Sequence, residues 1–336
     1  MRLLFVKPKH IGDALLLTPT LAAAGQRYPD ALIWVVVRSG TEDILAGCPV
    51  IDRLLTTAAP ENQNRSRWSW WNDLKLLREL RAQRFDYAFE LSNSDRGRLL
   101  AGFSKARRRC ANAEVYPLSQ FWQTRFTSLS HFDWRERHQV EADFFSVAEQ
   151  LPLGASSPPP LIFQRKATRG CHLGSLADYV VIHPGTRWQR KRWPEESWIE
   201  LGRKLLNRVS TVVISVGPDV EEIASGARLA AALGSHAVST DGKLSWAQLA
   251  GLLYAARLFV GLDTASMHLA AACQCPTVAL FAASVARHWH PWRVRHRLVG
   301  AALKPGERAL DDAMDRIPPG EVLAACDELL AAPVSG

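Results

Sequence analysis

The chain has 336 residues, of which 47% are hydrophobic and 22% are charged, and these values predict two folded domains and exclude a disordered or fibrous chain. The formal net charge is +8, and residues 1–168 hold most of the excess, with 23 Lys and Arg against 17 Asp and Glu. Such an excess attracts nucleic acid, an anionic membrane surface or an acidic substrate. The six cysteines are dispersed, which indicates a reducing compartment rather than a disulfide framework.

The first apolar run, Leu3–Val6, is typical of a strand and not of a targeting segment. A signal peptide needs a longer apolar stretch and a small-residue cleavage site, whereas Lys7, Lys9 and Asp13 follow this run at once. No window reaches the roughly 18 uninterrupted apolar residues of a membrane span. We therefore expect the protein in the cytoplasm.

Short runs rich in Val, Ile and Leu alternate with amphipathic stretches along the whole chain. The predicted strands are Leu3–Val6, Leu32–Val37, Arg53–Thr57, Tyr87–Leu91, Tyr179–His183, Thr211–Val216, Leu258–Leu262 and Thr277–Phe281. The predicted helices include Asp73–Arg84, Glu195–Asn207, Val220–Leu233, Trp246–Ala256 and Glu321–Leu330. This alternation predicts an α/β fold with doubly wound parallel sheets.

A Ser-Ser-Pro-Pro-Pro run at Ser156–Pro160 is the best candidate for a domain boundary, because it can form neither a helix nor a central strand. It predicts two Rossmann-like domains, residues 1–160 and 161–336, that face each other across a cleft. The last helix could pack on either domain. Residues 61–72 and 117–139 break the alternation and are predicted to be basic and aromatic insertions rather than core strands.

Three loops that follow predicted strands carry residues suited to chemistry. The first, Lys7-Pro-Lys-His-Ile-Gly-Asp13, precedes a helix. On spacing alone, Asp13 fits two roles equally: a cap for the helix start, or a base that removes a proton from an acceptor hydroxyl. Neither a Gly-x-Gly-x-x-Gly nor a Gly-x-x-x-x-Gly-Lys-Ser/Thr motif is present, so the standard nucleotide fingerprints are absent.

The second loop runs from His183 to Pro194 and has four cations within six residues, which suits phosphate unless the loop is only a solvated basic turn. The third, Gly261-Leu-Asp-Thr-Ala-Ser-Met-His268, leads into a helix predicted over Leu269–Cys273. A helix start offers unpaired N–H groups and a positive dipole end to a diphosphate. Asp263 or Thr264 could equally be no more than the cap of that helix.

Taken together, the three loops resemble those of the lipopolysaccharide heptosyltransferases, glycosyltransferase family 9. The matching motifs are Lys-x-x-x-Ile-Gly-Asp-x-Leu-x-x-Thr-Pro, Pro-Gly-Thr followed by Lys-Arg-Trp-Pro-Glu-Glu-x-Trp, and Asp-Thr-x-x-Met-His-Leu-Ala-Ala-Ala followed by Pro-Thr-Val-Ala-Leu-Phe. The resemblance implies a GT-B fold, with an acceptor-binding first domain and a donor-binding second domain. It also implies an inverting transfer that needs neither a metal nor another cofactor, performed by a monomer.

The resemblance also implies roles for individual positions. Asp13 matches the proposed general base, Lys191 the lysine that contacts donor phosphate, and Thr186 a donor-binding threonine. The remaining donor-binding positions are Glu221 for the ribose, in a register that could slip to Glu222, Asp263 near the sugar, and Thr264, Ala265, Ser266 and His268 in the pyrophosphate loop. Ala265 stands where many family members carry Gly.

The implied reaction moves L-glycero-D-manno-heptose from ADP-heptose to the inner core of lipopolysaccharide, with peripheral contact to the inner membrane surface. The residues expected to bind that acidic acceptor are Lys7, His10, Arg65, Arg67 and Arg98. Nucleic acid is not an expected partner, because it would not explain Asp13 and Asp263 in loops after strands. Two alternatives stay open: a GT-B epimerase of nucleotide sugars, or a transferase of the same family that uses another sugar or acceptor.

Overall fold

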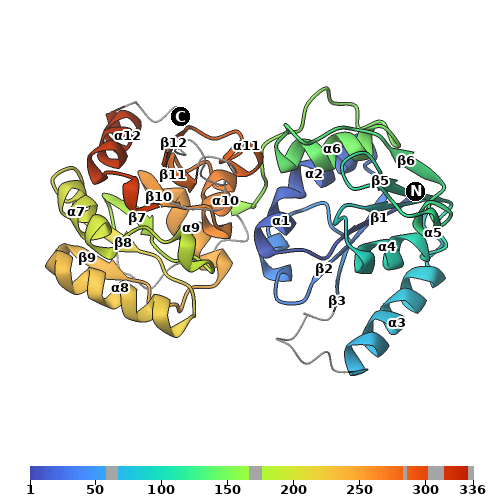
Figure 1. The fold of residues 1–336 in the computed structure, drawn as a ribbon, viewed down its shortest axis with the longest axis horizontal. Helices are drawn as coiled ribbons and strands as arrows, with labels where there is room; N and C mark the ends of the chain where they lie inside the picture. The colour runs from blue at the N-terminus through green and yellow to red at the C-terminus, as the bar shows by residue number, and fades with distance from the viewer. Residues whose placement is uncertain (58–66, 166–175, 283–285, 302–313, 332–336) are drawn as a thin grey trace. The chain divides into compact units, whose positions relative to one another are not determined.

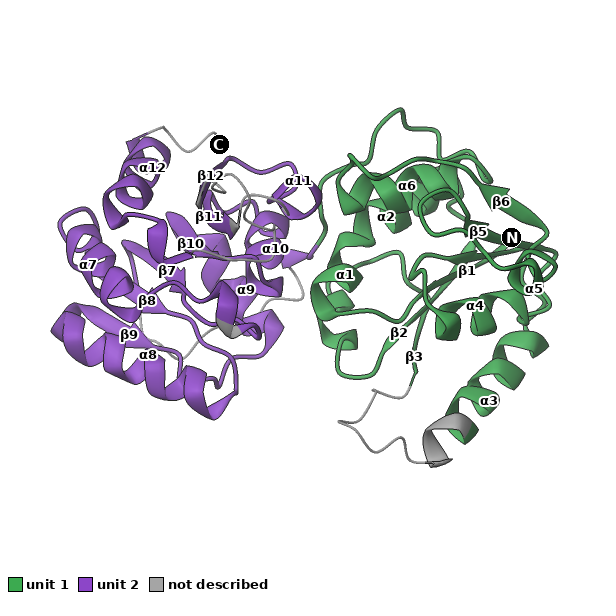
Figure 2. Ribbon diagram, viewed as in Figure 1, with its two compact units in different colours: residues 1–162 green, residues 163–336 purple. Residues whose placement is uncertain are grey.

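The computed structural model describes residues 1–57, 67–165, 176–282, 286–301 and 314–331. The chain forms two compact units, residues 1–162 and 163–336 (Figure 2). The division falls shortly after the Ser156–Pro160 run. Each unit has a six-stranded parallel sheet with helices packed on it (Figure 1).

The first unit is built on a sheet with the order β3-β2-β1-β4-β5-β6, in which all neighbouring strands are parallel. Its strands are β1 (Arg2–Lys7), β2 (Leu32–Arg38), β3 (Arg53–Thr57), β4 (Tyr87–Glu90), β5 (Arg108–Asn112) and β6 (Ser128–Ser130). Its helices are α1 (Ile11–Leu16), α2 (Thr18–Arg27), the 3-10 helix η1 (Glu42–Leu45), α3 (Arg67–Ala82), α4 (Asp95–Gly102), α5 (Gln120–Gln123) and α6 (Gln139–Ala148). The strand order reverses between β1 and β4, so the loops after these two strands meet where α/β sheets bind ligands.

Strand β1 lies at the centre of this unit and is buried on both faces. Leu4 and Val6 pack in one core with Leu80 of α3 and Leu100 of α4. Figure 1 shows α2 and α6 on the other face of the sheet. Because side chains alternate along a strand, Lys7 projects toward that second face, where its ammonium group meets α6. A lysine at the end of a central strand is therefore enclosed by helices.

The second unit repeats this plan with the order β12-β11-β10-β7-β8-β9, again with parallel neighbours. Its strands are β7 (Tyr179–His183), β8 (Thr211–Ile214), β9 (Ala237–Ser239), β10 (Leu258–Leu262), β11 (Thr277–Ala282) and β12 (His296–Ala301). Its helices are α7 (Glu195–Leu205), α8 (Val220–Leu233), α9 (Trp246–Ala255), α10 (Ala265–Ala272), α11 (Ala286–Trp289) and α12 (Pro319–Ala331), with 3-10 turns η3 (Gln189–Lys191), η4 (Gly234–His236) and η5 (Met314–Arg316). Here the order reverses between β7 and β10.

Helices α7, α8 and α12 share one core with the second sheet. Trp198 and Leu201 of α7, Leu229 of α8 and Val322 of α12 are all buried in it. The last helix thus packs within the second unit, which answers the question that the sequence left open. Among the described residues, no helix combines the length and apolar character needed to cross a membrane.

All eight strands predicted from the sequence are present, with ends that differ by two residues at most. Four strands were not predicted: β5, β6, β9 and β12. Residues 117–139, which were predicted to hold no core strand, contain the edge strand β6 (Ser128–Ser130), which pairs with β5. Strands β6 and β9 have only three residues each, and β6, β9 and β12 lie at sheet edges, so their sequences lack the long apolar runs of doubly buried strands.

Candidate active site

The loop after β1 leads directly into α1 and places Asp13 in the first turn of that helix. Its Oδ2 atom accepts the backbone N–H of His10 at 3.2 Å, so the side chain does help to close the helix start. Its Oδ1 atom is buried and has no hydrogen-bond partner among the described residues. Asp13 is 7% exposed. One oxygen therefore supports the helix start, while the role of Asp13 as a base stays a prediction.

A second carboxylate ends β4, the other strand at the point of reversal, but both of its oxygens are engaged locally. Glu90 is buried and accepts the N–H groups of Ser92 at 2.8 Å and Asn93 at 3.2 Å. Burial raises its pKa above the usual range. A Cβ atom on Gly97 would lie 2.4 Å from this carboxylate, so the helix that follows must carry glycine there. Glu90 shapes its loop, which leaves Asp13 as the candidate base.

The predicted acceptor residues occupy very different environments. Lys7 has no exposed surface and forms an ion pair with Asp143 of α6, so the prediction that it contacts the acceptor is corrected: it is a core residue. The Arg98 side chain on α4 is only 14% exposed, and its guanidinium lies 3.3 Å from the Asp95 carboxylate. This differs from the open surface cation that was expected. His10 is exposed at the start of α1. Arg65 lies outside the described residues, and Arg67 lies on α3, where the structure describes the backbone only.

In the second unit, the loops after β7 and β10 bring Lys191 and Asp263 together. The Lys191 ammonium lies 2.8 Å from Asp263 Oδ2, although 72 residues separate the two in sequence. Both side chains are largely but not fully buried. Lys191 belongs to η3, and Asp263 directly follows β10. The structure therefore brings together two of the predicted donor-site residues.

Helix α10 begins beside this ion pair and has no side-chain cap. Thr264 precedes its first residue, Ala265, but makes no capping hydrogen bond, and its Oγ1 atom is buried without a partner among the described residues. Asp263 is paired with Lys191 instead. The view of either residue as a plain cap is therefore wrong. The first-turn N–H groups of α10 are not capped by a side chain, which is the arrangement that binds anions.

His183, a buried residue that the sequence did not single out as a site residue, contacts the start of α10. It ends β7, and its Nε2 lies 3.3 Å from Ser266 Oγ in the first turn of the helix. Its Nδ1 lies 3.2 Å from Ser215 Oγ, after β8. Burial lowers the pKa of His183 to about 4, so the ring is neutral at physiological pH. His268, which was predicted as a site residue, is buried in α10.

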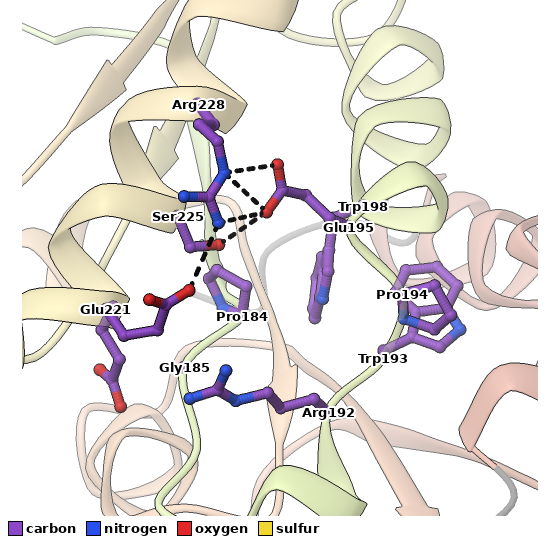
Figure 3. A pocket seen from close by; sticks show the side chains of 11 residues that line it. Pro184, Gly185, Arg192, Trp193, Pro194, Glu195, Trp198, Glu221, Ser225 and Arg228 are labelled. Carbon is purple, nitrogen blue, oxygen red and sulfur yellow. Dashed lines mark hydrogen bonds and ion pairs between the residues drawn. The ribbon is translucent and has the colours of Figure 1, made fainter.

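A pocket of about 320 Å³ opens between the starts of α7 and α8 (Figure 3). Glu195 forms a double hydrogen bond with Arg228, with contacts of 2.8 Å and 3.0 Å, and this arginine lowers the pKa of the carboxyl. The Glu221 carboxylate also lies 3.6 Å from the Arg228 guanidinium, and the Glu221 side chain is 60% exposed. Figure 3 shows Arg192 on the opposite side of the pocket, reaching toward Gly185.

Glu222, and not Glu221, lies against the loops at the carboxyl edge of the second sheet. Its Oε2 accepts the backbone N–H of Gly217, after β8, at 2.8 Å. A Cβ atom on Gly185, after β7, would lie 2.4 Å from the same oxygen, so a larger residue there would displace the Glu222 carboxylate. Thr186, the next residue, is buried, and its Oγ1 accepts the N–H of Trp188 at 3.4 Å. Glu221 and Glu222 both line the pocket, and the assignment of the ribose contact to one of them stays a prediction.

Two Rossmann-like units of this topology define the class of the fold, which is GT-B. The chain belongs to glycosyltransferase family 9, the heptosyltransferase family, whose model matches residues 74–312. The family inferred from the three motifs is thereby confirmed.

Individual relatives and structures agree with this family. The chain is 29% identical to lipopolysaccharide heptosyltransferase 3 of Escherichia coli over 97% of its own length and 98% of the relative. A structure of an E. coli heptosyltransferase with ADP has a TM-score of 0.80 at 20% identity, covering 98% of this chain and all of that one. The ADP-heptose lipopolysaccharide heptosyltransferase II of E. coli has a TM-score of 0.79 at 22% identity, covering 98% and 99%. At these identities the structures support the fold.

Proposed function

We propose that this enzyme transfers L-glycero-D-manno-heptose from ADP-heptose to the inner core of a lipopolysaccharide, with inversion at the anomeric carbon and without a metal ion. The names of the relatives support the sugar and the acceptor, and the E. coli structure with ADP supports the nucleotide. The observation that carries the proposal is the start of α10, where uncapped N–H groups lie beside Lys191.

The donor diphosphate would bind at this helix start. Thr264, Ala265 and Ser266 present the first turn of α10, whose dipole attracts anions. When the anomeric carbon–oxygen bond breaks, the negative charge that develops on the leaving diphosphate would be stabilised by these N–H groups and by the Lys191 ammonium. The chain's own dipoles and cation would thus supply the charge stabilisation that a divalent ion supplies elsewhere.

The acceptor hydroxyl would be activated by Asp13. The hydroxyl oxygen forms the new bond to the anomeric carbon from the face opposite the leaving diphosphate, and its proton passes to Oδ1, the oxygen that has no partner among the described residues. Attack from the opposite face inverts the configuration. The first unit would therefore hold the acceptor and the second the donor.

Other positions in the second unit would fix the nucleoside and the sugar. We assign the ribose to Glu222, whose carboxylate lies against Gly185 and Gly217. Thr186 and His268 would line the donor site, and Asp263 would lie near the sugar through its contact with Lys191. Neutral His183 would keep Ser266 in place without adding a charge beside the diphosphate.

The first unit carries 21 Lys and Arg against 17 Asp and Glu, and this net positive charge suits an acidic lipopolysaccharide core. We propose peripheral contact with the inner face of the cytoplasmic membrane, where a lipid-anchored acceptor would be reached by a monomer. Phe121 of α5 is half exposed, and its ring lies 5.0 Å from the Arg125 guanidinium. An aromatic ring beside a cation suits the interface of an anionic bilayer.

The test is to incubate the enzyme with a panel of nucleotide sugars and truncated core lipids, and to read the products by mass spectrometry. The proposal expects a heptose-sized mass increase on a core lipid, dependent on ADP-heptose and unchanged by EDTA. Activity that EDTA abolishes and magnesium restores would contradict the metal-free mechanism. A changed free sugar without a lipid product would identify an epimerase, and transfer from another donor would identify a different specificity within the family.

A further inference from the structure

The core of the first unit contains a carboxylate that the proposed mechanism does not use. Asp143 lies on α6 and is 2% exposed. Its Oδ1 accepts the side-chain N–H of Gln139 at 3.0 Å, and its Oδ2 accepts the ammonium of Lys7. Lys7 is wholly buried at the end of β1, the strand that leads into the Asp13 loop. A buried ion pair therefore joins the strand before the Asp13 loop to α6, the helix that packs against α1.

Asp13 lies in the first turn of α1, which packs against α6, the helix that carries Asp143. Burial raises the pKa of Asp143, the Lys7 ammonium opposes that rise, and the negative charge of Asp13 adds to it. Asp143 and Asp13 thus share one neighbourhood with a single buried lysine. Lys7 is held by Asp143, while Asp13 Oδ1 has no partner among the described residues. The two carboxylates are not equivalent, because only one of them is bonded to the lysine.

We propose that Asp143 is a positioning residue that binds Lys7 and so keeps Asp13 free of an ion pair, with one oxygen available for the proton of the acceptor hydroxyl. This inference rests on the proposed role of Asp13 as the base. The pair formed by Lys7 and Asp143 is neutral, so the three side chains together carry one negative charge, located on Asp13. A proton that arrives at Asp13 neutralises that charge and meets no opposing cation from the pair.

Removal of the Asp143 charge changes this balance. With asparagine at 143, the Lys7 ammonium is buried without its counterion, and Asp13 is the nearby carboxylate that can pair with it. An opposite charge within about 4–6 Å of a carboxylate favours its ionised form and lowers its pKa by about 1–3 units. Asp13 would then hold a proton less readily and act as a weaker base. The fold needs a partner for Lys7, and Asp143 supplies one that takes no part in the chemistry.

Several other ionisable groups lie on the elements packed against α1 and must be considered in any pH experiment. They are Lys9 and His10 in the loop before α1, His138 and Glu141 at the start of α6, and Glu42 and Asp43 in η1. Of these, Lys9 also acts on Asp143, in the same direction as Lys7. Glu141 offers a matched control, because it is on the same helix and its charge is paired with Arg137 at 3.8 Å.

The experiment measures the pH dependence of kcat/KM in a set of variants of the full chain. Asp143→Asn should move the acid limb of the profile down by about one pH unit or more, and lower kcat at pH 7 by about tenfold, a part of the 10²–10⁴-fold that a general base contributes. The Kd for ADP should not change. Lys7→Met should leave the acid limb in place or move it up, because no cation remains to pair with Asp13.

The double variant Lys7→Met, Asp143→Leu removes both charges and replaces a buried ion pair with apolar groups of similar volume, a change that cores often tolerate. It should restore the wild-type profile. An acid limb that stays unshifted in Asp143→Asn would overturn the proposal, as would a downward shift in Lys7→Met or in the double variant. If Asp143→Asn does not fold, the other two variants still decide the question by these signs. Glu141→Gln should keep the wild-type profile.

The outcome for the base itself is separate. If Asp13→Asn keeps wild-type turnover, the proposed function of Asp13 fails, and the positioning role of Asp143 fails with it. If Asp13→Asn is inactive while the Asp143→Asn profile is unshifted, the base is supported and only the positioning role is overturned.

Discussion

Replacing Lys191 with alanine should weaken ADP binding while the second unit keeps its fold. The substitution removes the Lys191 ammonium, which lies beside the start of α10 and 2.8 Å from the Asp263 carboxylate. A hydrogen bond to a charged group contributes about 1.5–3 kcal/mol, which corresponds to a rise in Kd of about 10- to 150-fold. The loss should fall on the diphosphate, so adenosine, which lacks phosphate, should bind equally to both forms.

Asp263→Asn should have the opposite effect on ADP. In the ion pair, Asp263 competes with phosphate for the Lys191 ammonium, and its negative charge repels the diphosphate. Without that charge, ADP should bind at least as tightly as it does to the wild type, although transfer should fall because the proposed sugar contact is altered. A matched control is Lys204→Ala on α7, which removes an exposed lysine paired with Glu200 at 2.6 Å. This control should leave ADP binding unchanged.

Isothermal titration calorimetry with ADP at one salt concentration measures all three variants, and thermal melting checks that each is folded. The opposite signs for Lys191→Ala and Asp263→Asn separate a phosphate site from a structural ion pair. If the pair only stabilised the loop, both variants would weaken ADP binding to a similar degree. That result, or an unchanged Kd in Lys191→Ala, would refute the assignment of Lys191 to the donor phosphates.

Three further results are expected. Asp13→Asn should lower kcat by about 10²–10⁴-fold while calorimetry shows an unchanged Kd for ADP. Glu222→Gln should weaken ADP binding more than Glu221→Gln, and equal losses would return the register to an open question. For His183, burial lowers the pKa to about 4, so the unfolded state takes up its proton first. The free energy of unfolding should therefore decline from pH 6.5 to pH 4, by about 3 kcal/mol at most, and urea unfolding should show a smaller decline in His183→Gln.

The central strands of both sheets could be predicted from the sequence because burial on two faces leaves a clear composition. Leu3–Val6 and Leu258–Leu262 are continuous apolar runs, and the structure shows them buried. The edge strands lack this signal, and so does β5, although it lies between β4 and β6. β5 begins with Arg108 and Arg109, and its buried residues include Asn112, whose side chain is bonded to Ser130 and Ser146. A strand defined by such contacts cannot be recognised before its partners are known.

The positions of the site loops could be predicted, but the direction of individual side chains could not. Glu221 and Glu222 are adjacent in one motif, and successive residues of a helix point about 100° apart, since a turn holds 3.6 residues. The motif cannot decide which of the two faces the sheet edge. That depends on Gly217, five residues before Glu222, and on Gly185 in the loop after β7, which together leave room for the Glu222 carboxylate.

Buried polar residues form the part of the site that hydrophobic patterns misread. A pattern counts Lys7 as a polar residue after a strand and therefore predicts exposure, which led to its assignment as an acceptor contact. Its burial depends on Asp143, which is 136 residues away in sequence. Desolvating either charge alone would cost several kcal/mol, so neither residue makes sense without the other. His183 is likewise a buried polar residue, and its ring nitrogens contact the hydroxyl groups of Ser215 and Ser266, which are remote in sequence. In both units, then, a buried polar group at the end of the first strand is held by partners that are remote in sequence.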